Sequence, residues 1–100
     1  MQKIQQGDVI LMAATIPVAA KPSSGLVLAE GETTGHAHRV TRGQAKMLRD
    51  GERIFLRVLS GDATVTHEEH GPITLPRGDY EVKRVREYDH FAEAARVIMD

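Results

Sequence analysis

The chain of 100 residues has the length of one domain and can bury a single small core. Its formal net charge of -1 gives no general attraction to nucleic acids or anionic membranes, which excludes binding that depends on bulk charge alone. It has no cysteine, so disulfides, thiolate metal ligands and cysteine nucleophiles are excluded, and its core must be mainly aliphatic because it holds only two Phe and two Tyr.

Nothing in the sequence indicates export or membrane insertion. The N-terminal residues MQKIQQGD show no signal-peptide pattern. The apolar run from Val9 to Ala20 is interrupted by Pro17 and is too short to span a bilayer. We therefore expect a soluble, cytoplasmic protein without a membrane partner.

Apolar and β-branched stretches separated by turn residues predict short strands along most of the chain. Two prolines and a Ser-Ser-Gly sequence predict a loop over 14–25. The stretch 42–52 predicts one or two helical turns or a long loop, and Ser60-Gly61-Asp62 predicts the tight turn of a hairpin. The predicted strands are residues 7–13, 26–31, 35–41, 53–60, 63–69, a short one within 71–79, and 80–87.

One helix is predicted, over residues 89–99 at the C-terminal end. Asp89 suits its N-cap position. Apolar residues recur at helical spacing: Phe91, Ala94, Ala95 and Ile98. Six or seven short strands followed by one helix predict a mainly β protein, a small antiparallel β-barrel or sandwich with a C-terminal helix. We expect a single domain over 1–100, with its β core over about 7–88.

Four of the five histidines fall in two close pairs, His36 with His38 and His67 with His70. Alternate side chains of a strand share a face, so His36 and His38 should lie on the face of Val40, which we expect to point inward. The same alternation places His67 with the apolar residues of its own strand. His70 should lie where that strand ends.

Buried imidazoles need partners, since an unpaired buried polar group costs about 1–3 kcal/mol. A divalent ion such as Zn, Mn, Fe or Ni would satisfy several imidazoles at once. The sequence therefore predicts a histidine-built site with His36, His38, His67 and His70 as metal ligands. The alternative is a set of ordinary structural or surface histidines.

Residues beside the histidines are candidates for further roles. Glu69 is the candidate catalytic general base, because Glu68 has the opposite strand parity to His67. The candidate substrate-binding residues carry hydroxyl or guanidinium groups near the first histidine pair: Thr33, Thr34 and Arg39. For the segment GETTG, a plain hairpin turn is the alternative.

The segments GHAH at 35–38 and LPRGDYEV at 75–82 resemble the cupin pattern. In that pattern a glycine-rich lead-in precedes His-X-His, and a later Pro-X-Gly turn precedes a strand that carries another histidine. The resemblance implies His36 and His38 as metal ligands, with Glu81 at the position of the later histidine. The glutamate that cupins carry shortly after His-X-His is absent, because RVTRGQ follows here.

Over nearly its full length the chain resembles a group of small uncharacterised bacterial and phage proteins. The resemblance rests on the segments GDVIL, LAEGETTGHAHRV and THEEHGPITLPRGDYEVKRVREYD. It implies no activity, and it favours a phage or mobile-element origin.

Three functions remain open on the sequence alone. The first is a small metal-binding β-barrel protein with a histidine-built site, which would be a metal-dependent hydrolase or another small enzyme if a coordination position is open. The second is a metal-independent phosphodiesterase whose histidines act as acid and base. The third is a non-enzymatic accessory protein that forms a homodimer or binds a protein partner through the helix at 89–99. Nucleic-acid contact through the basic stretches 42–49 and 83–86 is disfavoured by the near-neutral charge but stays open.

Overall fold

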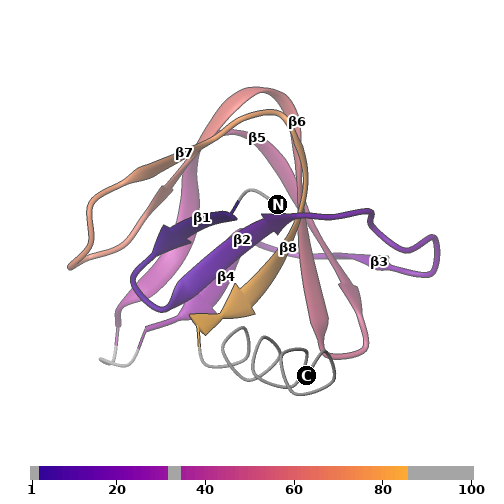
Figure 1. Ribbon diagram of the computed structural model, residues 1–100, viewed down its shortest axis with the longest axis horizontal. Helices are drawn as coiled ribbons and strands as arrows, with labels where there is room; N and C mark the ends of the chain where they lie inside the picture. Colours follow the sequence, from indigo (N-terminus) through magenta and orange to yellow (C-terminus); the bar gives the residue numbers. More distant parts are fainter. Residues whose placement is uncertain (1–2, 32–34, 86–100) are drawn as a thin grey trace, which may run out of the picture.

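The computed structural model describes residues 3–31 and 35–85, and these form eight strands of one antiparallel sheet (Figure 1). The main path of the sheet runs β1-β2-β8-β6-β5-β3, while β4 pairs with β5 and β7 pairs with β6. The strands are β1 (Lys3–Gln6), β2 (Val9–Ala13), β3 (Lys21–Ser23), β4 (Val27–Glu30), β5 (Ala37–Asp50), β6 (Arg53–Thr66), β7 (Ile73–Leu75) and β8 (Gly78–Arg84).

Two strands of 14 residues each, β5 and β6, form the long hairpin on which the sheet is built. Their ladder shifts register three times between Val40 and Ala45, which marks bulges. Close to these shifts, Gly43 has φ +92° and Gly61 has φ +59°, values that glycine adopts without steric cost. The two glycines therefore bend a continuous hairpin instead of ending its strands.

This hairpin overturns two of our predictions. Residues 42–50 belong to β5, so the helical turns or long loop expected over 42–52 are wrong. The turn expected at Ser60-Gly61-Asp62 is also wrong, because β6 continues through it. In both places a glycine lies inside a bulged strand. Glycine is common both in turns and in bulges, so the sequence alone does not tell the two apart.

The curled sheet encloses one aliphatic core. β1 lies against β7 although no ladder joins them within the described residues. The most buried members of this core come from five strands: Val9, Leu11, Leu28, Met47, Leu56, Val58, Ala63, Val65 and Leu75. The sheet curls because each of its strands must direct an apolar face to the same interior.

The predicted closed barrel or sandwich is wrong, since the strands form one open sheet. Short β1 and β3 lie at the ends of its main path, and neither was predicted, because β1 is polar and β3 lies in the proline-containing loop. The helix expected over 89–99 lies outside the described residues, and no helix is among the elements that residues 3–31 and 35–85 form. None of the described residues belongs to a helix that is long and apolar enough to cross a membrane.

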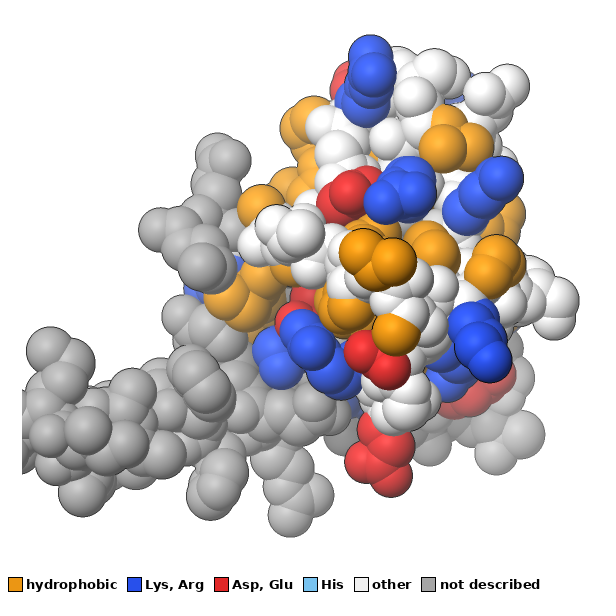
Figure 2. Space-filling model, turned by 90° about the vertical axis from the view of Figure 1, so that its right-hand side faces the viewer, with side chains coloured by type: hydrophobic (Ala, Val, Ile, Leu, Met, Phe, Trp, Pro, Cys, Tyr) orange, Lys and Arg blue, Asp and Glu red, His pale blue; other side chains and the backbone are white. Residues whose placement is uncertain are grey.

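One face of the molecule carries charges of both signs. Figure 2 shows Lys and Arg side chains on this face with acidic and apolar side chains between them. Among the described residues on this face, no continuous cationic surface of the kind that binds phosphate backbones is visible. That nucleic acid is a disfavoured partner stays a prediction.

Replacing Gly43 by alanine should destabilise the fold strongly. A Cβ at this position would lie 2.6 Å from the Asp62 carbonyl oxygen and 2.8 Å from the Ala63 Cα, in addition to the strain of φ +92°. We expect the free energy of unfolding, measured by urea titration, to fall by about 2–4 kcal/mol. The matched control is Gly61→Ala, where φ is also positive but nothing lies within 4 Å. It should lose only about 1–2 kcal/mol, and equal losses would contradict the close packing of β5 on β6.

Glu81 on β8 is a buried carboxylate that belongs to a surface-facing ion pair and does not line the histidine cavity described below. Arg53 donates two hydrogen bonds of 3.1 Å to it, and Lys83 lies 3.5 Å away. The hydrogen bonds from Arg53 are the main cause that lowers the pKa of Glu81, against an opposing effect of burial. The place of a third cupin-like ligand is therefore taken by an ion-paired residue.

Stability should consequently depend on pH through Glu81. Because the folded-state pKa is depressed, the stabilisation is complete above the unfolded-state pKa of about 4.3 and is lost as pH falls through the folded-state value. We expect Glu81→Gln to cost about 1 kcal/mol near neutral pH, a modest value because Arg53 is half-exposed. The difference from the wild-type protein should vanish at about pH 2. A difference that persists unchanged in acid would show that packing, not charge, is responsible.

Candidate histidine site

Four histidine side chains gather at one end of the long hairpin. Arg39 on β5 pairs with Thr66 on β6, so the residues just before and just after this pair meet at the same end of the sheet. The ring centroids of His38 and His67 lie 4.3 Å apart, those of His67 and His70 lie 4.7 Å apart, and those of His36 and His67 lie 5.7 Å apart. The two histidine pairs of the sequence thus form one cluster.

His38 is the buried centre of the cluster, with 1% of its surface exposed. Its Nδ1 lies 2.9 Å from the side-chain oxygen of Gln6 at the end of β1. The Gln6 amide nitrogen donates to the carbonyl oxygens of Val65 and Gly71, which fixes its oxygen toward His38. An amide oxygen only accepts, so Nδ1 of His38 carries a proton and the neutral ring presents the lone pair of Nε2.

Asp8, which directly precedes β2, lies on the Nε2 side of His38. Its Oδ1 is 3.4 Å from that nitrogen, while its Oδ2 accepts a hydrogen bond of 2.6 Å from Arg84. Burial acts to raise the pKa of Asp8, but the hydrogen bond and the charge of Arg84 outweigh it and lower the pKa. Burial, followed by the nearby His67, lowers the pKa of His38 against the opposing effect of Asp8. The pair is therefore a carboxylate beside a neutral imidazole near neutral pH.

His67 has a different hydrogen-bonding state from His38. Its Nδ1 accepts a bond of 3.0 Å from the backbone N–H of Glu69, so in the neutral ring the proton lies on Nε2. Ligand atoms of His36, His67 and Glu68 also lie within 4.8 Å of one another. Opposite ligands of one ion lie at most roughly 4.2 Å apart, so any two of these atoms that are separated by the full 4.8 Å would have to move closer to share an ion.

Glu68 and Glu69 interact with neighbours on the β5 side of the cluster. The Glu68 carboxylate accepts a bond of 2.7 Å from the Ala37 N–H and lies 3.8 Å from Arg39, and the bond from Ala37 is the main cause that lowers the pKa of Glu68. The Glu69 carboxylate lies 3.7 Å from His36 Nδ1, a buried atom without a hydrogen-bond partner among the described residues. Both carboxylates are therefore available close to the cluster.

A cavity of about 220 Å³ opens beside the rings and is lined by Gly7, Asp8, Gly31, His36, His67, Glu69 and His70. Gly7 and Gly31 lack a side chain, and the imidazole rings occupy the space that a Cβ would fill. A Cβ on Gly7 would lie 2.5 Å from His70 Nε2, and a Cβ on Gly31 would lie 2.9 Å from His36 Cβ and 3.0 Å from His67 Nε2. The backbone thus approaches the rings more closely than any other residue would allow.

The predicted site residues fall in different surroundings. His38 is buried as expected, His36 and His67 are partly buried, and His70 is exposed. Strand parity does not carry the inward placement of His67, because β6 ends at Thr66 and the chain bends there. Arg39 is partly exposed and contacts Glu68, which leaves its predicted role in substrate binding untested. Thr33 and Thr34 lie outside the described residues.

Three residues of the cluster were missed by the sequence argument: Gln6, Asp8 and Arg84. Gln6 and Asp8 flank Gly7 between β1 and β2, where we predicted only the start of a strand at residue 7. Arg84 had been grouped with a basic stretch of β8. Their connection arises from the pairing of β2 with β8 and from the approach of β1 to β7, which no local pattern shows.

The approach of Gly31 to the rings can be tested without any ligand. We expect Gly31→Ala to lose about 1–3 kcal/mol in urea unfolding and to shift the ¹⁵N resonances of the His67 ring, because the added methyl group crowds that ring. Gly71→Ala is the matched control, since neither glycine has a positive φ and nothing lies within 4 Å of a Cβ at Gly71. Unmoved His67 resonances in Gly31→Ala would contradict the arrangement.

Comparison with known families adds one finding. A family model described as "Domain of unknown function (DUF8820)" matches residues 5–85, which include every histidine of the cluster. No curated protein and no solved structure matches the chain. The match agrees with the resemblance to an uncharacterised group of proteins, whereas the cupin likeness and the phage origin stay predictions.

Proposed function

The chain belongs to the DUF8820 family of domains of unknown function, and we propose that it is a small metal-binding protein whose ion is held first by His38 and Asp8. The observation that carries the proposal is the contact between His38 Nε2 and Asp8 Oδ1. Gln6 holds the ring proton on the opposite nitrogen, so two acceptor atoms face each other. Two facing acceptors repel unless a proton or a cation lies between them.

The distance favours a metal ion over a proton. A protonated imidazole and a carboxylate approach to about 2.7–2.9 Å in a charge-assisted hydrogen bond. The observed separation is 3.4 Å. Two ligands at about 2.0–2.1 Å from one tetrahedral ion lie about 3.3–3.4 Å apart, which agrees with the observed spacing.

The rest of the donor set suits a divalent transition metal. Imidazole ligands favour Zn, Fe or Ni, and a carboxylate beside them is also compatible with Mn. His67 and His70 have their rings 4.3 Å and 6.2 Å from that of His38, and both follow the end of β6, where side-chain rotation would bring a ring nitrogen to the ion. The hydrogen bond from His38 to Gln6 is the kind of outer contact that orients a metal-binding histidine.

An ion with an open position facing the 220 Å³ cavity would lower the pKa of bound water and could support hydrolysis. Glu69 lines that cavity with an exposed carboxylate, which suits the general base that the sequence proposes. His36 would then hold Glu69 in place instead of binding the ion directly, given the 3.7 Å between His36 Nδ1 and the carboxylate.

One observation favours a second candidate, metal-free acid–base catalysis on a phosphodiester. His38 presents a lone pair at Nε2, whereas His67 carries a proton at Nε2, because their Nδ1 atoms have opposite hydrogen-bonding roles. Two adjacent neutral imidazoles of opposite tautomer offer an acceptor nitrogen and a donor N–H, and such a pair can divide the roles of base and acid. A metal titration separates this candidate from the first.

We expect purified protein loaded separately with Zn, Mn, Fe or Ni to retain about one equivalent of at least one metal, measured by mass spectrometry after desalting. His38→Ala should abolish retention. Asp8→Asn keeps the side-chain shape but removes a charged ligand atom, and it should weaken binding by at least about 100-fold in calorimetry. The matched control is Asp79→Asn, which alters a carboxylate paired with Arg57 away from the cluster and should leave affinity unchanged.

A protein that retains none of the four metals would overturn the proposal. Hydrolysis of an activated phosphodiester that survives a chelator and is lost in His67→Ala would then support the acid–base candidate. Binding that is insensitive to Asp8→Asn would instead move the ion to the group formed by His36, His67 and Glu68.

A further inference from the structure

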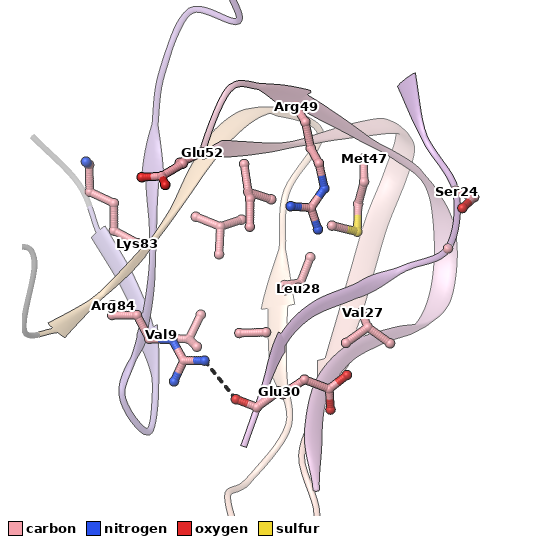
Figure 3. Close-up of a pocket in the computed structure, with 14 residues that line it drawn as sticks. Val9, Ser24, Val27, Leu28, Glu30, Met47, Arg49, Glu52, Lys83 and Arg84 are labelled. Carbon is pink, nitrogen blue, oxygen red and sulfur yellow. Dashed lines mark hydrogen bonds between the residues drawn. The ribbon is translucent and has the colours of Figure 1, made fainter. Parts of the chain in front are cut away.

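Arg84, at the end of β8, joins two segments that border the histidine cluster. Its Nη1 donates a bond of 2.6 Å to Asp8 Oδ2, and its Nη2 donates a bond of 2.8 Å to the carbonyl oxygen of Glu30. Figure 3 shows the second bond at the rim of a larger cavity, with Arg84 reaching across from β8 to the end of β4. One guanidinium thus bridges residues 8 and 30.

Both bridged segments carry a part of the cluster. Asp8 offers its other oxygen to His38, and it is also held through its backbone, since its carbonyl accepts a bond of 2.8 Å from the Val85 N–H. Glu30 directly precedes Gly31, whose N–H donates to the His36 carbonyl at 2.7 Å and where an added Cβ would lie 3.0 Å from His67 Nε2. The bridge therefore fixes both the carboxylate and the glycine that leaves room for the imidazoles.

We propose that Arg84 is the positioning residue of the metal site, a role that rests on the proposed function: it holds Asp8 Oδ1 toward His38 by bridging Oδ2 to the end of β4. The planar guanidinium donates from two nitrogens held in a fixed relative orientation. The single ammonium of lysine cannot reproduce this two-armed geometry. Arg84 acts through Asp8 and Glu30, and it does not contact the ion.

A positioning role and a purely electrostatic role of Arg84 predict opposite effects of its replacement on metal affinity. A cation near a divalent ion repels it, so a role of charge alone requires that a neutral residue at 84 tighten metal binding. A positioning role requires that the same replacement weaken binding, because Asp8 loses its fixed orientation. Lysine keeps the charge and loses one arm of the bridge, so it separates the two roles further.

The experiment measures the dissociation constant of Zn²⁺ by competition with a coloured chelator, in wild-type protein and in Arg84→Met and Arg84→Lys. We expect both variants to bind about 10- to 100-fold more weakly than wild type, the usual effect of losing an outer partner of a metal ligand. The visible spectrum of the Co²⁺-loaded protein should change as well, because Asp8 no longer coordinates in a fixed orientation. The matched control is Arg57→Met, which removes a two-armed ion pair with Asp79 between β6 and β8.

The possible results separate a positioning role of Arg84 from a role of its charge and from a purely structural role. Tighter binding by Arg84→Met overturns the proposal and shows a role of charge. Unchanged affinity and an unchanged Co²⁺ spectrum, together with a lower melting temperature of the metal-free protein, overturn it in favour of a purely structural role. If Arg84→Met does not fold, Arg84→Lys decides between the same results. A wild-type protein that folds normally but binds none of Zn, Mn, Fe and Ni overturns the function itself, a result distinct from wild-type binding that the variants retain.

Discussion

The side chain of Gln6 is the contact on which the arrangement of the cluster depends. Its amide nitrogen donates to Val65 on β6 and to Gly71 beyond it, and its oxygen faces His38 on β5. One buried amide therefore joins the first strand to both arms of the long hairpin and also decides which nitrogen of His38 carries the proton. Because unsatisfied buried amides are costly, this network has only one fully bonded arrangement. The fold and the chemical state of the site are set together.

The same contact explains why the cluster contains unlike histidines. His38 is buried and donates from Nδ1, whereas His67 accepts at Nδ1 from a backbone N–H, so two histidines of one cluster carry the ring proton on different nitrogens. Asp8 and Arg84 then add a carboxylate with one oxygen held and one oxygen directed at His38. The site is thus asymmetric. On one side His38 Nε2 and Asp8 Oδ1 form a pair of acceptors, whereas on the other side His67 and His70 lie in the segment that comes after the end of β6.

The sequence alone predicted a mainly β chain and the candidate pairs of histidines, because alternation of apolar residues and the spacing of His36 and His38 are local patterns. It failed at Gly43 and Gly61, where glycine bends a strand that we expected to end, and hence at the closed barrel. It also missed Gln6, Asp8 and Arg84, since their contacts join residues as far apart as 8 and 84. Strand alternation placed His38 inside, but it could not treat His70, which lies beyond the strand.

The separation of the site residues along the chain has a consequence for folding. Residues 6–8, 30–31, 36–38, 67–70 and 84 come together only when the sheet has curled and β8 has paired with β2. An unfolded chain has these groups dispersed and holds an ion weakly, so an ion bound by the native cluster would stabilise the native state by mass action. Occupancy of the cluster would then report completion of the fold: a chain cleaved or arrested before β8 docks would lack the clamp on Asp8 and would release its ion to intact copies.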